Sequence, residues 1–279
     1  MNSSRPSIAD KRRSFRQLHA SGCFAIPNPW DPGAAVYLQS LGFRALATTS
    51  SGYAWSRGRR DGTSPLDEVL VHLRELVEAT DVPINADFES GFAADAAGVA
   101  HSVRLAVQTG VAGLSIEDSS GDPARPLRTR ADALARVRAA REAIDRSGAD
   151  VLLVARAECF WVGHPDLDET IARLRAYANA GADCLYAPGL HTREQIAAVV
   201  AAVAPRPVNL LMGTAGTLTM RDIAALGVRR VSVGGALARV AWAALMNAAR
   251  TLVEEGRFDG LAGAASGPEL DALFRARTG

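Results

Sequence analysis

Two acidic clusters contain the side chains of this sequence that are best suited to chemistry. Asp87 and Glu89 follow one short apolar run, and Glu117 and Asp118 follow a second one. If both runs are neighbouring parallel strands, four carboxylates meet at one sheet edge and repel each other unless a cation lies between them. Oxygen-only ligands of this kind suit Mg²⁺ or Mn²⁺. The alternative is that these acids only cap the helices that follow, but two acidic pairs at equivalent positions favour a metal site.

Arg156 is the cationic candidate, because it follows a further apolar run at 151–155. Its planar guanidinium can bind a carboxylate or a phosphonate through two parallel hydrogen bonds. The other interpretation makes it a structural partner of Glu117 or Glu158. Apolar runs that end in acids, an arginine and small residues indicate a small anionic substrate held on a metal.

Ser51 and Gly52 follow another apolar run and could present a hydroxyl and backbone N–H groups to a developing oxyanion. A plain Ser-Gly turn is the alternative. His164 and His191 fall in predicted loops on the same side and are weaker acid/base candidates.

The elements that must position these residues alternate regularly between apolar strands and helices. The predicted strands are 23–26, 44–49, 82–84, 111–116, 151–155, 182–186, 208–211 and 228–233. The predicted helices are 8–21, 34–41, 65–80, 94–109, 130–147, 168–180, 192–203, 220–226, 236–255 and 268–275. Eight strand–helix repeats predict an α/β protein, a single (β/α)8 TIM barrel over 1–279 that includes a C-terminal helical extension at 236–279.

A doubly wound open sheet is the alternative fold. It normally has a Gly-rich phosphate turn after its first strand, where this chain has Asn28-Pro29-Trp30. In a barrel, function lies at the C-terminal strand ends, which adds Trp30 and Asn209 to the candidates. Two long polar loops, 56–63 and 118–129, are predicted lids over the barrel mouth.

The composition limits the class of protein. The 31 basic and 30 acidic residues give a net charge of +1, and no basic patch alternates with aromatic residues, so nucleic acid is not an expected partner. The three cysteines lack metal-finger spacing, no apolar stretch is long enough to cross a bilayer, and no signal peptide is evident. We therefore expect a cytoplasmic protein without a membrane partner.

Taken together, these motifs resemble the isocitrate lyase/phosphoenolpyruvate mutase superfamily over nearly the whole chain. The matching elements are Asn28-Pro29-Trp30-Asp31, Thr48-Thr49-Ser50-Ser51-Gly52, Asp61 after a Gly-Arg-Arg stretch, Asp87-Phe88-Glu89-Ser90-Gly91, Ile116-Glu117-Asp118 and Ala155-Arg156. The resemblance implies a Mg²⁺-dependent barrel that makes or breaks a C–C, C–P or C–O bond next to a 2-oxo acid through an enolate. It also implies a homo-oligomer, a dimer or tetramer, in which the helix at 236–255 is exchanged between subunits.

The resemblance also implies the roles of individual residues. Asp87 would ligate Mg²⁺ (or Mn²⁺), with Asp61, Glu89 and Glu117 holding the ion through water. The implied substrate-binding residues are Trp30, Ser51, Gly52, Asp87, Arg156 and Asn209. The implied catalytic residues are Arg156, Ser51 and Glu117.

One loop departs from the family pattern. Isocitrate and methylisocitrate lyases carry Lys-Cys-Gly-His after the Glu-Asp pair, and its cysteine is the acid/base, whereas loop 118–129 has neither Cys nor His. Phosphonopyruvate enzymes carry a Lys-Thr-Asn-Ser type of loop there, which is missing too. The sequence therefore predicts a C–C lyase or decarboxylase for a small 2-oxo or 2-hydroxy acid resembling oxaloacetate. The alternatives are a C–P bond enzyme and a non-catalytic protein that binds Mg²⁺ and a 2-oxo acid.

Overall fold

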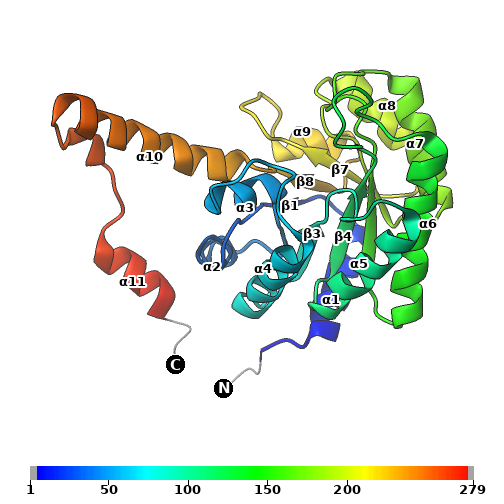
Figure 1. Cartoon of the computed structure of the whole chain (residues 1–279), viewed down its shortest axis with the longest axis horizontal. Helices are drawn as coiled ribbons and strands as arrows, with labels where there is room; N and C mark the ends of the chain where they lie inside the picture. Colours follow the sequence, from blue (N-terminus) through cyan, green and yellow to red (C-terminus); the bar gives the residue numbers. More distant parts are fainter. Residues whose placement is uncertain (1–4, 276–279) are drawn as a thin grey trace.

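Eight short parallel strands form one curled sheet in the computed structural model, which describes residues 5–275 (Figure 1). The order of neighbours is β1-β8-β7-β6-β5-β4-β3-β2. The two end strands lie side by side, because the Ala47 N–H donates to the Pro27 carbonyl at 3.1 Å. The predicted (β/α)8 barrel is confirmed, and the open doubly wound sheet is wrong.

The strands are β1 (Phe24–Ile26), β2 (Leu46–Ala47), β3 (Ile84–Asp87), β4 (Gly113–Glu117), β5 (Leu152–Arg156), β6 (Cys184–Tyr186), β7 (Val208–Leu211) and β8 (Arg230–Ser232). The helices are α1 (Ile8–Ala20), α2 (Pro32–Ser40), α3 (Ser50–Ser56), α4 (Leu66–Ala79), α5 (Ala96–Gln108), α6 (Arg130–Ser147), α7 (Leu167–Asn179), α8 (Arg193–Val203), α9 (Met220–Ala225), α10 (Ala236–Glu255) and α11 (Gly267–Arg275), with a 3-10 turn at Asp259–Leu261.

Local sequence signals explain where these elements begin and end. Helix α6 begins after Thr129, whose hydroxyl accepts from the Asp132 N–H, and it ends at Gly148 with φ 68°. The sequence did not predict α3, whose N-cap is Thr49, because the seven-residue helix is too short to show apolar periodicity.

The main core lies between the strands and the surrounding helices, where Leu73, Leu114 and Ile144 are fully buried. A second cluster fills the bottom of the barrel. There, helix α1 inserts Phe15 among small and apolar residues that include Ala45 and Ala112. The mouth at the opposite end therefore remains free for polar strand ends.

Asn28 ties three strand ends together at the mouth. Its amide donates to the Thr48 carbonyl at 2.8 Å, and its oxygen accepts from the N–H groups of Val233 and Gly234 at 3.0 and 2.8 Å. This one side chain links the ends of β1, β2 and β8.

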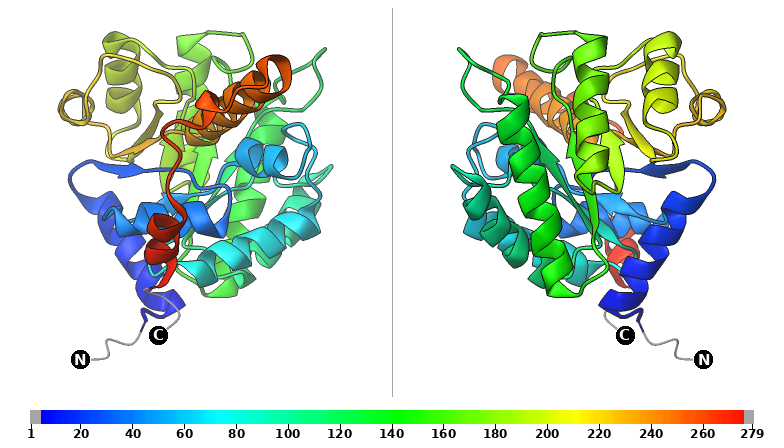
Figure 2. Two further views of the ribbon diagram at one scale, coloured as in Figure 1. Left: turned by 90° about the vertical axis from the view of Figure 1, so that its left-hand side faces the viewer. Right: turned by 90° about the vertical axis from the view of Figure 1, so that its right-hand side faces the viewer.

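Helix α10 leaves the barrel as an arm, and α11 lies apart from the end of that arm (Figures 1 and 2). Of its twenty residues only Ala238 is buried. Across the described residues 5–275, no helix is long and apolar enough to cross a membrane.

Candidate active site

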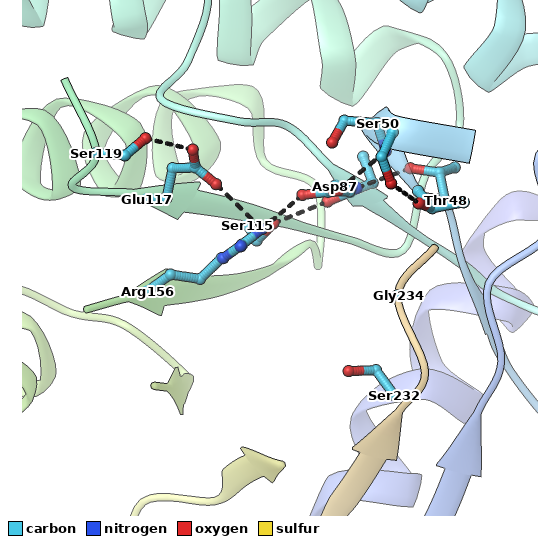
Figure 3. Close-up of polar contacts among 12 residues, drawn as sticks. Thr48, Ser50, Asp87, Ser115, Glu117, Ser119, Arg156, Ser232 and Gly234 are labelled. Carbon is cyan, nitrogen blue, oxygen red and sulfur yellow. Dashed lines mark hydrogen bonds and ion pairs between the residues drawn. The ribbon is translucent and has the colours of Figure 1, made fainter. Parts of the chain in front are cut away.

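Arg156 occupies the centre of a carboxylate cluster at the C-terminal ends of β3, β4 and β5 (Figure 3). Its Nη1 lies 2.7 Å from Asp87 Oδ1 and 3.1 Å from Glu117 Oε2, and its Nε lies 2.9 Å from Glu158 Oε1. The guanidinium also stacks over the Tyr186 ring at 4.9 Å. Arg156 thus pairs with both glutamates that the sequence offered as structural partners, and also with Asp87.

Asp87 is fixed by the neighbouring strand and helix. Its backbone N–H donates to Thr48 Oγ1 at 2.8 Å, and its Oδ2 accepts from the Ser50 N–H at 3.0 Å. Ser50 is the first residue of α3, so a helix N-terminus stabilises this carboxylate. One Asp87 oxygen therefore faces the helix and the other faces Arg156.

A left-handed turn after β3 brings Glu89 back over the mouth. Glu89 has φ 47° and Phe92 has φ 53°, conformations that non-glycine residues rarely adopt. The Glu117 N–H donates to the Glu89 carbonyl at 2.9 Å and holds the turn against the end of β4. Strained backbone of this kind costs about 1–3 kcal/mol and is often found at functional sites.

Burial and mutual repulsion raise the pKa values of the clustered acids. Burial, followed by the charges of Asp87 and Glu117, raises the pKa of Glu89 to about 8. Burial raises the pKa of Glu158 to about 8 against the opposing effect of Arg156. Burial also raises the pKa of Glu117. Although Asp61 is exposed as a residue, its carboxyl lines the cavity, where desolvation and the charge of Asp87 raise its pKa.

We expect the metal-free protein to lose stability as the pH rises from about 4.5 to about 8. Over this range Glu89 and Glu158 are protonated only in the folded state, so the folded state binds more protons than the unfolded one. Each such group contributes a slope of at most about 1.4 kcal/mol per pH unit. Urea unfolding in the presence of a chelator measures it.

Two matched variants test the origin of this slope. Glu89→Gln should make it shallower, while Glu75→Gln, at an exposed position of α4, should leave it as it is. An unchanged slope in Glu89→Gln would show that Glu89 ionises normally in the folded protein.

Asp118 does not belong to this cluster, so the expectation of four converging carboxylates is wrong for one of them. Its Oδ2 lies 2.9 Å from Arg173 Nη1 and accepts from the Tyr177 hydroxyl at 2.6 Å, and its Oδ1 accepts from the Glu158 N–H at 2.8 Å. Asp118 is 2% exposed and joins β4 to α7. Successive residues of a strand point to opposite faces, so Glu117 faces the mouth and Asp118 faces the helices.

The site opens into a cavity of about 980 Å³ at the barrel mouth. The predicted residues that line it are Ser51, Asp61, Asp87, Glu89, Glu117 and Arg156.

Trp30, Gly52 and Asn209 are not among the lining residues. A side chain at position 52 would clash with Thr49 and crowd Trp30, and the Gly52 N–H donates to Thr49 Oγ1 at 3.3 Å. That N–H group therefore caps the helix and does not face an oxyanion. The amide of Asn209 is used inside the barrel, where it bonds to Ser232 and Arg230.

Several lining residues were not predicted from the sequence. Trp55 of α3 lines the cavity where Trp30 was expected, and Tyr186 lies under the guanidinium of Arg156. Glu158, which the sequence offered only as a partner of Arg156, also lines the cavity. Ser119 donates to Glu117 Oε1 at 2.5 Å. The alternation of inward and outward residues along β6 could have indicated Tyr186, because it follows the buried Cys184 by two positions.

The two candidate histidines occupy different places. His191 lines the cavity, and its Nδ1 lies 3.0 Å from the Gly189 carbonyl. His164 lines a separate depression next to Cys159 and Glu169. Only His191 is therefore placed to reach a bound substrate.

The predicted lid at 118–129 is a structured loop that borders the cavity. Ser119 and Leu127 form an antiparallel bridge, and the Ser120 N–H donates to the Pro126 carbonyl at 2.8 Å. Gly121 and Asp122 line the cavity wall.

The donors at the mouth fit Mg²⁺ in chemical type and in charge. The carboxylates of Asp61, Asp87, Glu89 and Glu117 offer only oxygen ligands. The charges of neighbouring acids help to raise the pKa of Glu89, and a cation between these acids would relieve their repulsion. Among the described residues, no three carboxyl, histidine or cysteine groups converge closely enough to coordinate one ion directly. This spacing is compatible with an ion that takes one carboxylate and keeps several waters, as Mg²⁺ usually does.

The comparisons with known proteins agree with this geometry. A family model described as phosphoenolpyruvate phosphomutase matches residues 15–253. The chain belongs to this family. The resemblance to the wider superfamily is thereby confirmed.

Three relatives illustrate the range of the phosphoenolpyruvate phosphomutase family and its neighbours. A Burkholderia cenocepacia J2315 structure, provisionally described as a lyase/mutase, is 45% identical, with a TM-score of 0.92 and 97% of both chains covered. Oxaloacetate decarboxylase of Paraburkholderia xenovorans is 31% identical over 81% of this chain and 76% of its own. Oxaloacetate acetylhydrolase in complex with its product oxalate is 27% identical, with a TM-score of 0.84 and 97% and 95% of the two chains covered.

Proposed function

We propose that this protein is a Mg²⁺-dependent C–C lyase or decarboxylase. Its substrate would be a small 2-oxo or 2-hydroxy acid resembling oxaloacetate, and the reaction would pass through a pyruvate-type enolate. The observation that carries the proposal is that Asp61, Asp87, Glu89 and Glu117 line one cavity at the mouth of a barrel of this family, where Arg156 pairs with Asp87 and Glu117. Its relatives include an oxaloacetate decarboxylase and an oxaloacetate acetylhydrolase.

In this proposal, residues at the mouth hold the metal ion and bind the substrate oxygens. Mg²⁺, when bound, would supply positive charge that stabilises the negative charge developing on the substrate oxygens. Asp87, held by Thr48 and Ser50, is the carboxylate best fixed to hold the ion. Ser51 lines the same wall and offers its hydroxyl to a substrate oxygen.

Decarboxylation suits this cavity because the loss of CO₂ requires no base to deprotonate an alcohol. The loop at 118–129 supplies neither Cys nor His. The carbanionic carbon needs a proton afterwards, and Glu158 and His191 both line the cavity. Burial raises the pKa of Glu158, which favours a role as proton donor.

Oxalate binding tests the proposal, because oxalate mimics the planar enolate of pyruvate. Calorimetric titration of oxalate should show binding with Mg²⁺ present and none after a chelator is added. A screen of 2-oxo and 2-hydroxy acids for Mg²⁺-dependent pyruvate release then identifies the substrate. If oxalate fails to bind in both conditions, the acidic cluster has only a structural role and the proposal is wrong.

A C–P bond enzyme is the second candidate, because the matching family is described as phosphoenolpyruvate phosphomutase. Phosphonopyruvate belongs in the same screen, with its conversion followed by phosphorus NMR. Oxalate binding without turnover of any acid in the screen would instead favour a non-catalytic binding protein.

We also propose that the arm formed by α10 and α11 packs against another copy of the chain. Its exposed apolar residues include Val240, Leu245, Met246 and Val253, with exposed fractions of 68%, 58%, 51% and 81%. Exposed apolar surface of this extent usually marks an interface.

Charges placed on the arm should break the assembly. Leu245→Glu combined with Val253→Glu should convert a dimer or tetramer into monomers, because each buried side chain of this size contributes about 1.5–3 kcal/mol. Sedimentation velocity measures the change, and Arg250→Glu on the same helix controls for added charge. An unchanged mass in the double variant would rule out the arm as the interface.

A further inference from the structure

A second arginine, Arg230 of β8, lies inside the barrel and is 2% exposed. Its Nε donates to Asn209 Oδ1 at 2.8 Å. Its Nη1 lies 3.3 Å from Asn85 Oδ1 and 3.5 Å from His19 Nε2. The guanidinium therefore reaches across the barrel interior from β8 toward β3 and α1. Barrel interiors are ordinarily filled by bulky apolar side chains.

The groups around Arg230 are neutral. Asn85 and Asn209 are amides, and burial together with the charge of Arg230 lowers the pKa of His19 to about 3. Burial raises the pKa of Tyr186 to about 12. Within residues 5–275, no carboxylate lies within ion-pair distance of Arg230.

This arrangement differs from that of the other deeply buried arginines. Arg156 has three carboxylates around it, Arg173 bonds to Asp118 and Glu169, and Arg136 bonds to Asp132. An isolated buried charge is costly, so buried cations are normally paired with an anion.

Arg230 has one donor group without a protein acceptor among the described residues. In the described part of the chain, Arg230 Nη2 bonds to no protein atom. Ser232 Oγ accepts from Asn209 Nδ2 at 3.0 Å, and the Ser232 hydroxyl is also hydrogen-bonded to Tyr186. Arg230 and Ser232 are two positions apart on β8 and therefore share its inward face. Figure 3 shows the Ser232 side chain directed away from the backbone of β8.

The large cavity extends down to these groups. Its wall includes Arg230 and Ser232 as well as Asn85 and Ser115. Ala47 also lines it, a small residue where a larger one would fill the barrel. A small solute that enters the mouth can thus reach the guanidinium.

We propose that Arg230 Nη2 binds a small carboxylate-type anion inside the barrel, as a site separate from the acidic cluster around Arg156. The anion supplies the counter-charge that the protein does not provide. Guanidinium groups bind such oxyanions well because the hydrogen bonds are charge-assisted. The acidic cluster itself repels anions, so the two parts of the cavity select for opposite charges. The site does not depend on which reaction the mouth catalyses.

Formate is the probe for this site. The melting temperature of the metal-free protein is measured while formate replaces a bulky sulfonate buffer anion at constant ionic strength. We expect a saturable rise of about 5 °C, because a ligand that binds only the folded state stabilises it by mass action. Arg230→Met should abolish the rise, whereas Arg229→Met, whose side chain bonds to the Gly22 carbonyl outside the barrel, should retain it.

A crystallographic measurement on the unaltered protein covers the case in which Arg230→Met fails to fold. Bromide, whose anomalous signal identifies it, should occupy a position next to Arg230 Nη2, and formate should displace it. The proposal is overturned if an ordered water occupies that position, or if the formate response persists in folded Arg230→Met. It is also overturned if bromide binds there but formate does not stabilise the protein, because the bromide would then be an adventitious ion only.

Discussion

Asp87→Asn is expected to lower the rate of Mg²⁺-dependent pyruvate release by on the order of 10³-fold or more. The substitution keeps the size of the side chain and removes the charge that an ion at the mouth requires. One Asp87 oxygen accepts from the Ser50 N–H and the other lies 2.7 Å from Arg156 Nη1. An amide can keep one of these contacts but repels at the other, so both the metal and the guanidinium lose their common partner.

The measurement compares kcat/KM on the substrate found in the screen with oxalate binding in the presence of Mg²⁺. Both should fall together if Asp87 holds the ion. Asp81→Asn is a matched control, because Asp81 pairs with Arg5 on the surface and precedes the N-terminal end of β3, opposite to the end that carries Asp87. Full activity in Asp87→Asn would remove the metal-dependent mechanism, and loss of activity with intact oxalate binding would assign Asp87 to a later step.

The barrel was predictable because its signals are local and repeated. Eight apolar runs separated by amphipathic helices admit few arrangements, and the acids at the ends of β3 and β4 mark the functional face. Asp87, Glu89, Glu117 and Arg156 could be placed at the mouth for this reason.

The remaining parts of the site depend on side-chain direction, which short strands specify weakly. Asp118 is adjacent to Glu117 but points toward α7, where Arg173 and Tyr177 bind it. Trp30 was expected at the cavity wall, but Trp55 of α3 lies there instead. Helix α3 was not predicted because it is too short to show periodicity. A residue-by-residue alternation applied to β4 would have separated Glu117 from Asp118.

Residues deep in the barrel are harder still to interpret from sequence. Arg230 stands in an apolar run and has no acidic neighbour in sequence, so nothing local indicates that it is buried with neutral partners. Only the closure of the sheet brings Asn85, Asn209 and His19 around it.

Arg156→Met is expected to destabilise the metal-free protein by about 3–5 kcal/mol, which corresponds to a fall in melting temperature of roughly 10 °C. Its side chain is 13% exposed and contacts Asp87, Glu117 and Glu158. Burial alone would lower the pKa of the guanidinium, but the charges of these three carboxylates raise it well above its ordinary value. Removing the cation leaves three acids facing one another without compensation.

Two conditions should partly restore the stability of Arg156→Met. Lower pH protonates the uncompensated acids, so the melting temperature of the variant should rise from pH 8 to pH 6 more than that of the unaltered protein. Added Mg²⁺ should also raise it more, because the ion replaces the missing positive charge. Arg156→Lys keeps the charge but loses the planar guanidinium, so its melting temperature should lie between those of Arg156→Met and the unaltered protein.

The control for Arg156→Met is Arg146→Met, which removes an exposed ion pair with Glu142 on α6. Surface pairs of this kind contribute little, so its free energy of unfolding should change by less than about 0.5 kcal/mol. If the two variants lost stability equally, or if Arg156→Met gained nothing from acid or from Mg²⁺, the carboxylates would not depend on Arg156 for compensation. The negative charge at the mouth would then be too weak to draw in a metal ion, and the proposed function would lose its physical basis together with the prediction.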